Sequence, residues 1–388
     1  MKPTTSLLLA MVDMALARPS PSPNTGKHYE CETYNIPISV ANVPTLAVPF
    51  TVKDQYEAID VLATLNNRSP PDWLIHPKLV NVSATYNMAM QYCFPVDQPV
   101  SSTLQLLTHG IGFNASYWDF YLPSNPSDAQ YSYISAATAA GYATLSYNRL
   151  GIDGSGPADP DKEVQPTVEL AIMARIIQTA REGKLSEKIP KPSKIVHVGH
   201  SFGSILSNAL AATAPTLFDG IVLTGYTGDT QYQKGNSAAL GFNRASDQNP
   251  SRWPAAQYPA GYVTWPNKWS LQLGFFSYPH FDPAVLDHTE AIKAPFSTAE
   301  FFAAGLLKFA APGLVAPVLY VNGEKDLGNC GGNCTGVLGE GTPSWTNFNG
   351  SSDIESVIVP GYGHGMNMHY GANKFYDTIS EWMKLRGF

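Results

Sequence analysis

A serine between two glycines is the residue of this sequence best suited to nucleophilic chemistry. Ser201 stands in Gly199-His200-Ser201-Phe202-Gly203, and it is the only serine with glycine at both i−2 and i+2. Residues 195–198 are rich in β-branched side chains and predict a short buried strand, whereas apolar residues in 205–210 recur at helical spacing. A G-x-S-x-G segment between a strand and a helix predicts a nucleophile elbow, a tight turn that exposes the serine hydroxyl.

A serine hydroxyl becomes a good nucleophile only when a neighbouring base takes its proton. We predict that His364 is this base, because it follows the last expected strand in the glycine-rich loop Gly361-Tyr362-Gly363-His364. His369 is the alternative, although it lies where the closing helix should begin. His109 is expected to shape a turn, and the histidines that flank the elbow, His197 and His200, are expected to be structural.

A carboxylate is needed to orient the base. Asp326 follows an apolar segment, residues 317–321, that predicts a strand. A carboxylate at the end of such a strand can accept a hydrogen bond from the far nitrogen of the imidazole and fix its tautomer. Asp229, which follows the strand predicted at residues 220–223, remains an alternative acid.

Strands and helices alternate along most of the chain. Strands are expected at 35–50, 80–95, 104–107, 142–147, 195–198, 220–223, 317–321 and 356–359, and helices at 134–140, 168–180, after Ser201 and at 373–385. This alternation predicts a mainly parallel sheet with right-handed crossovers.

The segment 228–312 interrupts the alternation and shows no clear strand. It is rich in large aromatic residues, among them Trp253, Trp265, Trp269, Phe275 and Phe276. Either these residues line a substrate pocket under a cap, or they form the core of an additional helical layer. Ligand pockets are mostly apolar, so the first interpretation favours an apolar or aromatic substrate.

Four motifs in this order resemble the α/β-hydrolase superfamily, and most closely its secreted fungal members of esterase and lipase type. They are His109-Gly110, Asn148-Arg149-Leu150-Gly151, the elbow, and the loop 361–364. The similarity extends from about residue 104 to the C-terminus, although Asn148 stands where many members have aspartate. It implies an α/β-hydrolase fold with a core of 18–227 and 313–388 and a helical cap at 228–312.

The resemblance also implies an oxyanion hole built from the backbone N–H groups of Phe202 and Ile111. With Ser201, Asp326 and His364 it predicts a secreted serine hydrolase that cleaves carboxylic esters through an acyl-enzyme, with no cofactor and no metal. An acyltransferase, a lactone-forming or lactone-opening enzyme and a serine peptidase all fit the same residues. A non-catalytic binding protein of the same fold is a more remote alternative.

A different class of protein is suggested by residues 110–115, which match the loose dinucleotide-binding pattern G-x-G-x-x-A after a strand. Bulky Phe113 at the point of cofactor approach argues against it. The formal net charge of −7 also disfavours nucleic acid and anionic membranes as partners. We therefore expect a small-molecule ester or lactone as the partner, and the sequence does not predict an oligomeric state.

The N-terminus predicts secretion. Lys2, an apolar stretch at 7–17 and a small-x-small site at Ala15-Leu16-Ala17 are typical of a signal peptide spanning residues 1–17, although a buried helix is the alternative. Four cysteines fit an oxidising compartment, with Cys31 expected to pair with Cys93 and Cys330 with Cys334; a zinc site lacks the paired spacing. Asn67, Asn81, Asn114, Asn333 and Asn349 lie in N-x-S/T sequons, which are glycosylation acceptors in secreted proteins.

Overall fold

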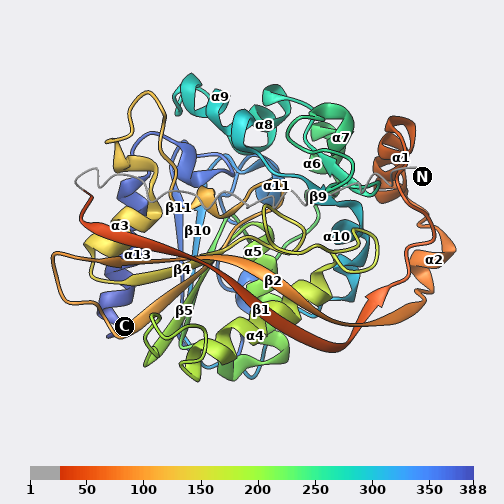
Figure 1. Ribbon diagram of the computed structural model, residues 1–388. Coiled ribbons are helices and arrows are strands. Elements are labelled where there is room, and N and C mark those ends of the chain that lie inside the picture. The colour runs from red at the N-terminus through yellow and green to blue at the C-terminus, as the bar shows by residue number, and fades with distance from the viewer. Residues whose placement is uncertain (1–26) are drawn as a thin grey trace, which may run out of the picture.

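An eight-stranded sheet runs through the computed structural model, which describes residues 27–388 (Figure 1). Its strand order is β1-β2-β4-β3-β5-β6-β10-β11. The strands are β1 Tyr29–Leu46, β2 Leu79–Pro95, β3 Thr103–Thr108, β4 Ala143–Tyr147, β5 Lys194–His200, β6 Gly220–Thr224, β10 Val318–Gly323 and β11 Ile354–Val359. In this order, each strand from β4 to β11 is parallel to the next one. The strands β1 and β2 lie at one edge of the sheet, where β1 pairs with β2 and β2 pairs with β4, both in antiparallel orientation. The predicted signal peptide lies outside the described residues.

Other parts of the chain cover both faces of the parallel sheet. Every residue of β3, β4, β6 and β10 is buried. Burial on both faces explains the consecutive apolar residues 221–223 of β6 and 318–321 of β10, whereas β4 is fully buried although its apolar and polar residues alternate. β1 starts at residue 29 instead of the predicted 35, because it pairs with β2 from Tyr29 opposite Pro95 to Leu46 opposite Leu79.

Two pairs of helices cover the sheet. α3 (Tyr133–Ala139) packs with α13 (Asn373–Leu385), and α4 (Pro166–Arg181) packs with α5 (Phe202–Thr213). Figure 1 shows the two pairs on opposite faces. Four of the five apolar positions that predicted α4 are buried, namely Ile172, Met173, Ile176 and Ile177, whereas Leu170 is only partly buried. The short helices α2 (Asp72–Ile75) and α12 (Pro343–Thr346) lie in connections.

The segment 228–312 forms a separate layer of helices, and α6 to α9 lie together at the top of the view in Figure 1. The helices are α6 Gln233–Leu240, α7 Ala245–Gln248, α8 Lys268–Phe275, α9 Pro283–Ile292 and α10 Thr298–Phe302. The expectation that the segment contains no strand is wrong, because β7 Asn243–Arg244, β8 Tyr262–Thr264 and β9 Phe296–Ser297 form a small antiparallel sheet. Strands of two or three residues are too short to show a period of two.

A helix from the leading region joins this layer. α1 (Gln55–Asn66) contacts α6 and β7, and the side-chain amide of Gln55 donates to the Phe242 carbonyl at 2.7 Å. The layer over the sheet is therefore built from two separate parts of the chain, only one of which the aromatic composition indicated.

Two disulfides are present, with the pairings expected from the sequence. Cys31–Cys93 joins β1 to β2, with an S–S distance of 2.07 Å. Cys330–Cys334 closes the turn that follows β10, with an S–S distance of 1.97 Å. All four cysteines are thereby oxidised and cannot serve as zinc ligands, and residues 27–388 contain no cluster of His, Cys, Asp and Glu suited to a metal ion.

Candidate active site

Ser201 occupies the turn between β5 and α5 in a backbone conformation that non-glycine residues rarely adopt. Its φ is 53° and its ψ is −115°. The neighbouring glycines make this turn possible, because a Cβ at position 199 would lie 2.7 Å from the Ser204 nitrogen and one at position 203 would lie 2.1 Å from the Thr108 carbonyl oxygen. The spacing of the glycines in the sequence thus reflects contacts between the elbow and its neighbours.

The side chains of Ser201, His364 and Asp326 form a continuous hydrogen-bonded chain. The Ser201 Oγ lies 2.8 Å from Nε2 of His364, and Nδ1 of His364 lies 2.7 Å from Oδ2 of Asp326. His364 follows β11 and Asp326 follows β10, so both come from loops at the carboxyl ends of parallel strands. A proton on Nδ1 that is donated to Asp326 leaves the lone pair of Nε2 facing the serine hydroxyl, as a general base requires.

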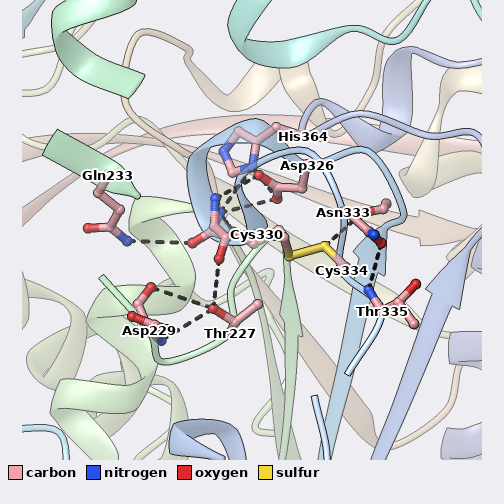
Figure 2. Close-up of a disulfide and its surroundings, with 12 residues drawn as sticks. Thr227, Asp229, Gln233, Asp326, Cys330, Asn333, Cys334, Thr335 and His364 are labelled. Carbon is pink, nitrogen blue, oxygen red and sulfur yellow. Dashed lines mark hydrogen bonds and ion pairs between the residues drawn. A yellow bond between two sulfur atoms is a disulfide. The ribbon is translucent and has the colours of Figure 1, made fainter. Parts of the chain in front are cut away.

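The alternative acid and base lie elsewhere. The Asp229 carboxylate accepts hydrogen bonds from the backbone and side chain of Gln231, at 2.9 and 2.6 Å, and Figure 2 shows it apart from His364. Nε2 of His369 accepts from the backbone N–H groups of Ser277 and Gly363, at 3.1 and 3.0 Å. Burial lowers the pKa of His369 to about 4, so the ring stays neutral and braces the loop that carries His364.

Phe202 and Ile111, whose backbone N–H groups are the expected oxyanion hole, lie at the same cavity as Ser201. Neither N–H group donates a hydrogen bond within the described part of the chain. His109 fixes the turn before Ile111, as expected: its Nδ1 donates to the Gly110 carbonyl at 2.8 Å, and its Nε2 accepts from the Arg149 backbone at 3.0 Å. Burial lowers the pKa of His109 to about 3, which keeps this ring neutral.

A buried ion cluster that the sequence did not reveal lies behind the elbow. The Arg149 guanidinium donates to Glu169 of α4 at 2.9 Å and to Glu300 of α10 at 2.7 Å, and all three side chains are at most 3% exposed. The guanidinium carbon lies 4.5 Å from the centre of the Phe202 ring. Burial, opposed by Arg149 and reinforced by Glu300, raises the pKa of Glu169. The cluster connects the helical layer to the residue that follows Ser201.

A cavity of about 80 Å³ opens beside Ser201. Its walls come from the elbow, from the loops of Asn329 and His364, and from α6 and α8. The lining residues are Ile111, Ser201, Phe202, Ile205, Gln233, Asn236, Ser237, Leu240, Trp265, Phe275, Phe301, Gly328, Asn329 and His364. Oδ1 of Asn236 and Nε1 of Trp265 are buried without a hydrogen-bond partner in the described structure. The wall is therefore mainly apolar, with these two unpaired polar atoms.

Only two of the five aromatic residues predicted to form the pocket border this cavity, namely Trp265 and Phe275. Trp253 is 1% exposed and does not line it, whereas Trp269 is 64% exposed at the surface of α8. Phe276 and Trp269 instead border a second, shallower hollow. The prediction was wrong for these three residues because composition does not indicate which face of a helix an aromatic side chain occupies.

The dinucleotide-binding pattern at 110–115 lacks its structural context. The turn leads into a three-residue 3₁₀ helix, Ala115–Tyr117, and not into the α-helix whose N-terminus would bind a pyrophosphate.

Of the asparagines in the N-x-S/T sequons, Asn114 is hydrogen-bonded within the protein, since its side-chain nitrogen donates to Asp153 at 2.6 Å. Among the other sequon residues, Asn67, Asn81, Asn333 and Asn349 are exposed.

Comparison with known proteins assigns the family. The alpha/beta hydrolase family profile matches residues 105–373, which include both expected oxyanion residues and all three members of the hydrogen-bonded chain. The chain belongs to the alpha/beta hydrolase family. No curated protein matches the sequence.

Solved structures of other proteins have a similar fold. An esterase from Thermogutta terrifontis is 14% identical, with a TM-score of 0.50, over 76% of this chain and 93% of that chain. An alpha/beta hydrolase fold protein from Chitinophaga pinensis is also 14% identical, with a TM-score of 0.50, over 77% of this chain and 94% of that one. At this identity the similarity establishes the alpha/beta hydrolase fold of the chain and not its substrate.

Proposed function

We propose that this family member is a secreted serine hydrolase that cleaves apolar carboxylic esters through an acyl-enzyme. The observation that carries the proposal is the hydrogen-bonded chain from Ser201 through His364 to Asp326, with two free backbone N–H groups beside it. These are the parts that acyl transfer to a serine requires.

In the proposed mechanism, Ser201 Oγ attacks the ester carbonyl while Nε2 of His364 takes the hydroxyl proton. The resulting tetrahedral oxyanion accepts hydrogen bonds from the N–H groups of Phe202 and Ile111. Removal of one such donor typically costs about 3–4 kcal/mol of transition-state stabilisation. His364 then returns its proton to the departing alkoxide, and Asp326 stabilises the imidazolium that forms between these steps.

Water completes the cycle by the same chemistry. His364 takes a proton from water, the resulting hydroxide attacks the acyl carbonyl, and Ser201 leaves with the proton that His364 returns. The acid product is thereby released and the free serine is regenerated, without any redox step or added cofactor. Attack by an alcohol instead of water would give acyl transfer by the same residues.

The size of the cavity bears on the acyl group. Its volume of about 80 Å³ is roughly half of the ~150 Å³ cavity that binds benzene in an engineered protein. Leu240, Trp265 and Phe275 make its wall apolar. We therefore propose that it holds a short apolar acyl chain rather than an aromatic ring.

Extracellular location is part of the proposal. Two disulfides require an oxidising compartment, and four of the five sequon residues are exposed. Within residues 27–388, no helix has the length and apolar character needed to cross a membrane. Expression in a secretory host, followed by N-terminal sequencing and glycan removal, tests both cleavage after residue 17 and sequon use.

A set of p-nitrophenyl esters from acetate to octanoate, assayed with wild type and Ser201→Ala, tests the proposed activity. We expect hydrolysis that is strongest for short acyl chains and that is lost in the variant. An amide and a lactone series measured in parallel separates an esterase from a peptidase or a lactonase.

A further inference from the structure

The turn that follows Asp326 contains a polar side chain that the proposed mechanism leaves unused. Asn329 lies on α11 (Leu327–Cys330) and is 4% exposed. Its backbone N–H donates to Oδ1 of Asp326 at 2.9 Å, and its Nδ2 lies 3.2 Å from Oδ2 of the same carboxylate. Asn329 therefore contacts both oxygens of the group that holds His364.

The side-chain amide can take only one orientation here. Its Nδ2 also donates to the Gly225 carbonyl at 2.9 Å, so a rotated amide would turn its oxygen toward two acceptors. Nδ2 lies 3.3 Å from Nδ1 of His364, and both nitrogens direct a proton at Oδ2 of Asp326. The carboxylate thus receives donors from the His364 ring and from both nitrogens of Asn329.

The backbone around Asn329 is held from several sides. The Gly332 N–H donates to the Asp326 carbonyl at 3.0 Å, and the Cys334 N–H donates to the Glu324 carbonyl at 2.9 Å. The Cys330–Cys334 disulfide begins at the residue after Asn329 and closes this turn beside Asp326 and His364, as Figure 2 shows. A short cross-linked turn limits the ways in which the Asn329 amide can move away from the carboxylate.

We propose that Asn329 is a positioning residue that fixes the Asp326 carboxylate against the edge of the His364 ring. The inference rests on the proposed function, because it assigns Asn329 to the same triad. A neutral donor suits this position, because it binds the Asp326 carboxylate without adding a charge beside the imidazole. A carboxylate at position 329 would instead repel Asp326 and stabilise the imidazolium.

Two variants and a matched control test the proposal. Asn329→Ala removes the side-chain donor, Asn329→Asp replaces it with an acceptor of nearly the same shape, and Asn333→Ala makes the same truncation at an exposed position of the same turn. All are produced in the bacterial periplasm, where the disulfides form and the Asn333 sequon stays unmodified. The readouts are the rate of Ser201 labelling by a fluorophosphonate, kcat and KM for p-nitrophenyl acetate across pH, and the melting temperature.

We expect Asn329→Ala to lower kcat and the labelling rate about 10- to 100-fold, with KM little changed, as for loss of a hydrogen bond to a charged group. A purely structural role would instead lower the melting temperature and leave kcat of the folded fraction unchanged. In Asn329→Asp, the acid limb of the kcat profile should move to higher pH, because the new carboxylate lies next to the imidazole. Asn333→Ala should behave as wild type.

Wild-type rates in folded Asn329→Ala would overturn the inference. If that variant does not fold, an unshifted pH profile in Asn329→Asp would overturn it instead. A wild-type protein that is neither labelled nor active would refute the proposed function and the inference together, whereas an active wild type with unaffected variants refutes the inference alone.

Discussion

Truncation of Leu240 should extend the acyl chains that the enzyme accepts. Leu240 is buried at the end of α6 and borders the cavity beside Ser201. It packs closely on Gly274 of α8, because a Cβ added at position 274 would lie 2.6 Å from Cδ2 of Leu240. Leu240→Ala deletes three carbon atoms from the cavity wall. The freed space should admit up to three further methylene groups of the substrate.

The magnitude follows from the apolar surface that these methylenes bury. Each contributes about 0.8 kcal/mol on leaving water, so three contribute roughly 2.4 kcal/mol. At 1.36 kcal/mol per tenfold change in rate, kcat/KM for a chain three methylenes longer should rise by up to roughly 60-fold relative to wild type. The acetate rate should change little, because acetate does not reach the new space.

The assay is kcat/KM for p-nitrophenyl esters from acetate to octanoate. Leu273→Ala is the matched control, since Leu273 is 49% exposed on α8 and does not border the cavity. Melting temperatures identify any loss of folded enzyme, which a buried Leu→Ala change commonly causes at a cost of about 2–5 kcal/mol. An unchanged chain-length profile in folded Leu240→Ala, or a wild type that prefers long chains, would refute the assignment of this cavity to the acyl group.

Two further predictions concern carboxylates. Asp326→Asn should lower kcat by about 10⁴-fold, because it favours the wrong tautomer of His364, whereas Asp229→Asn should retain wild-type kcat; the reverse result would exchange their roles. Burial raises the pKa of Asp161 to about 6, and within residues 27–388 its Oδ2 accepts a hydrogen bond only from the Thr51 hydroxyl, at 2.5 Å. The folded protein keeps this proton at a pH where the unfolded chain has lost it, so stability falls as the pH rises from about 4 to 6. Asp161→Asn should therefore raise the free energy of unfolding at pH 8, by up to about 3 kcal/mol, and leave it unchanged at pH 4. Urea titration of both proteins at the two pH values measures this, and an equal increase in the free energy of unfolding at pH 4 and pH 8 would contradict the prediction.

Features encoded by local geometry were predictable from the sequence. The elbow needs glycine at 199 and 203 because backbone atoms lie within 2.7 Å of any Cβ there, and that need appears directly as a motif. The strands β6 and β10 appear in the sequence as apolar runs for a similar reason, since both of their faces are covered. Each of these signals arises within a few consecutive residues.

Features that depend on contacts between distant residues were not predictable. Arg149 binds Glu169 and Glu300, which lie 20 and 151 positions away, and no local pattern marks either carboxylate. Asn329 lies three residues after Asp326, but only the folded turn shows that its amide faces the carboxylate. Trp269 is aromatic like Trp265, yet it lies on the exposed side of α8.

Covalent labelling of Ser201 tests the central claim most directly. After reaction with a fluorophosphonate, intact mass and peptide mapping should show one adduct, located on Ser201, with ester hydrolysis falling in proportion to labelling. Ser201→Ala should show no adduct and should hydrolyse esters at least about 10⁴-fold more slowly than wild type. An adduct on another residue that inactivates the enzyme, or wild-type turnover by folded Ser201→Ala, would contradict the account.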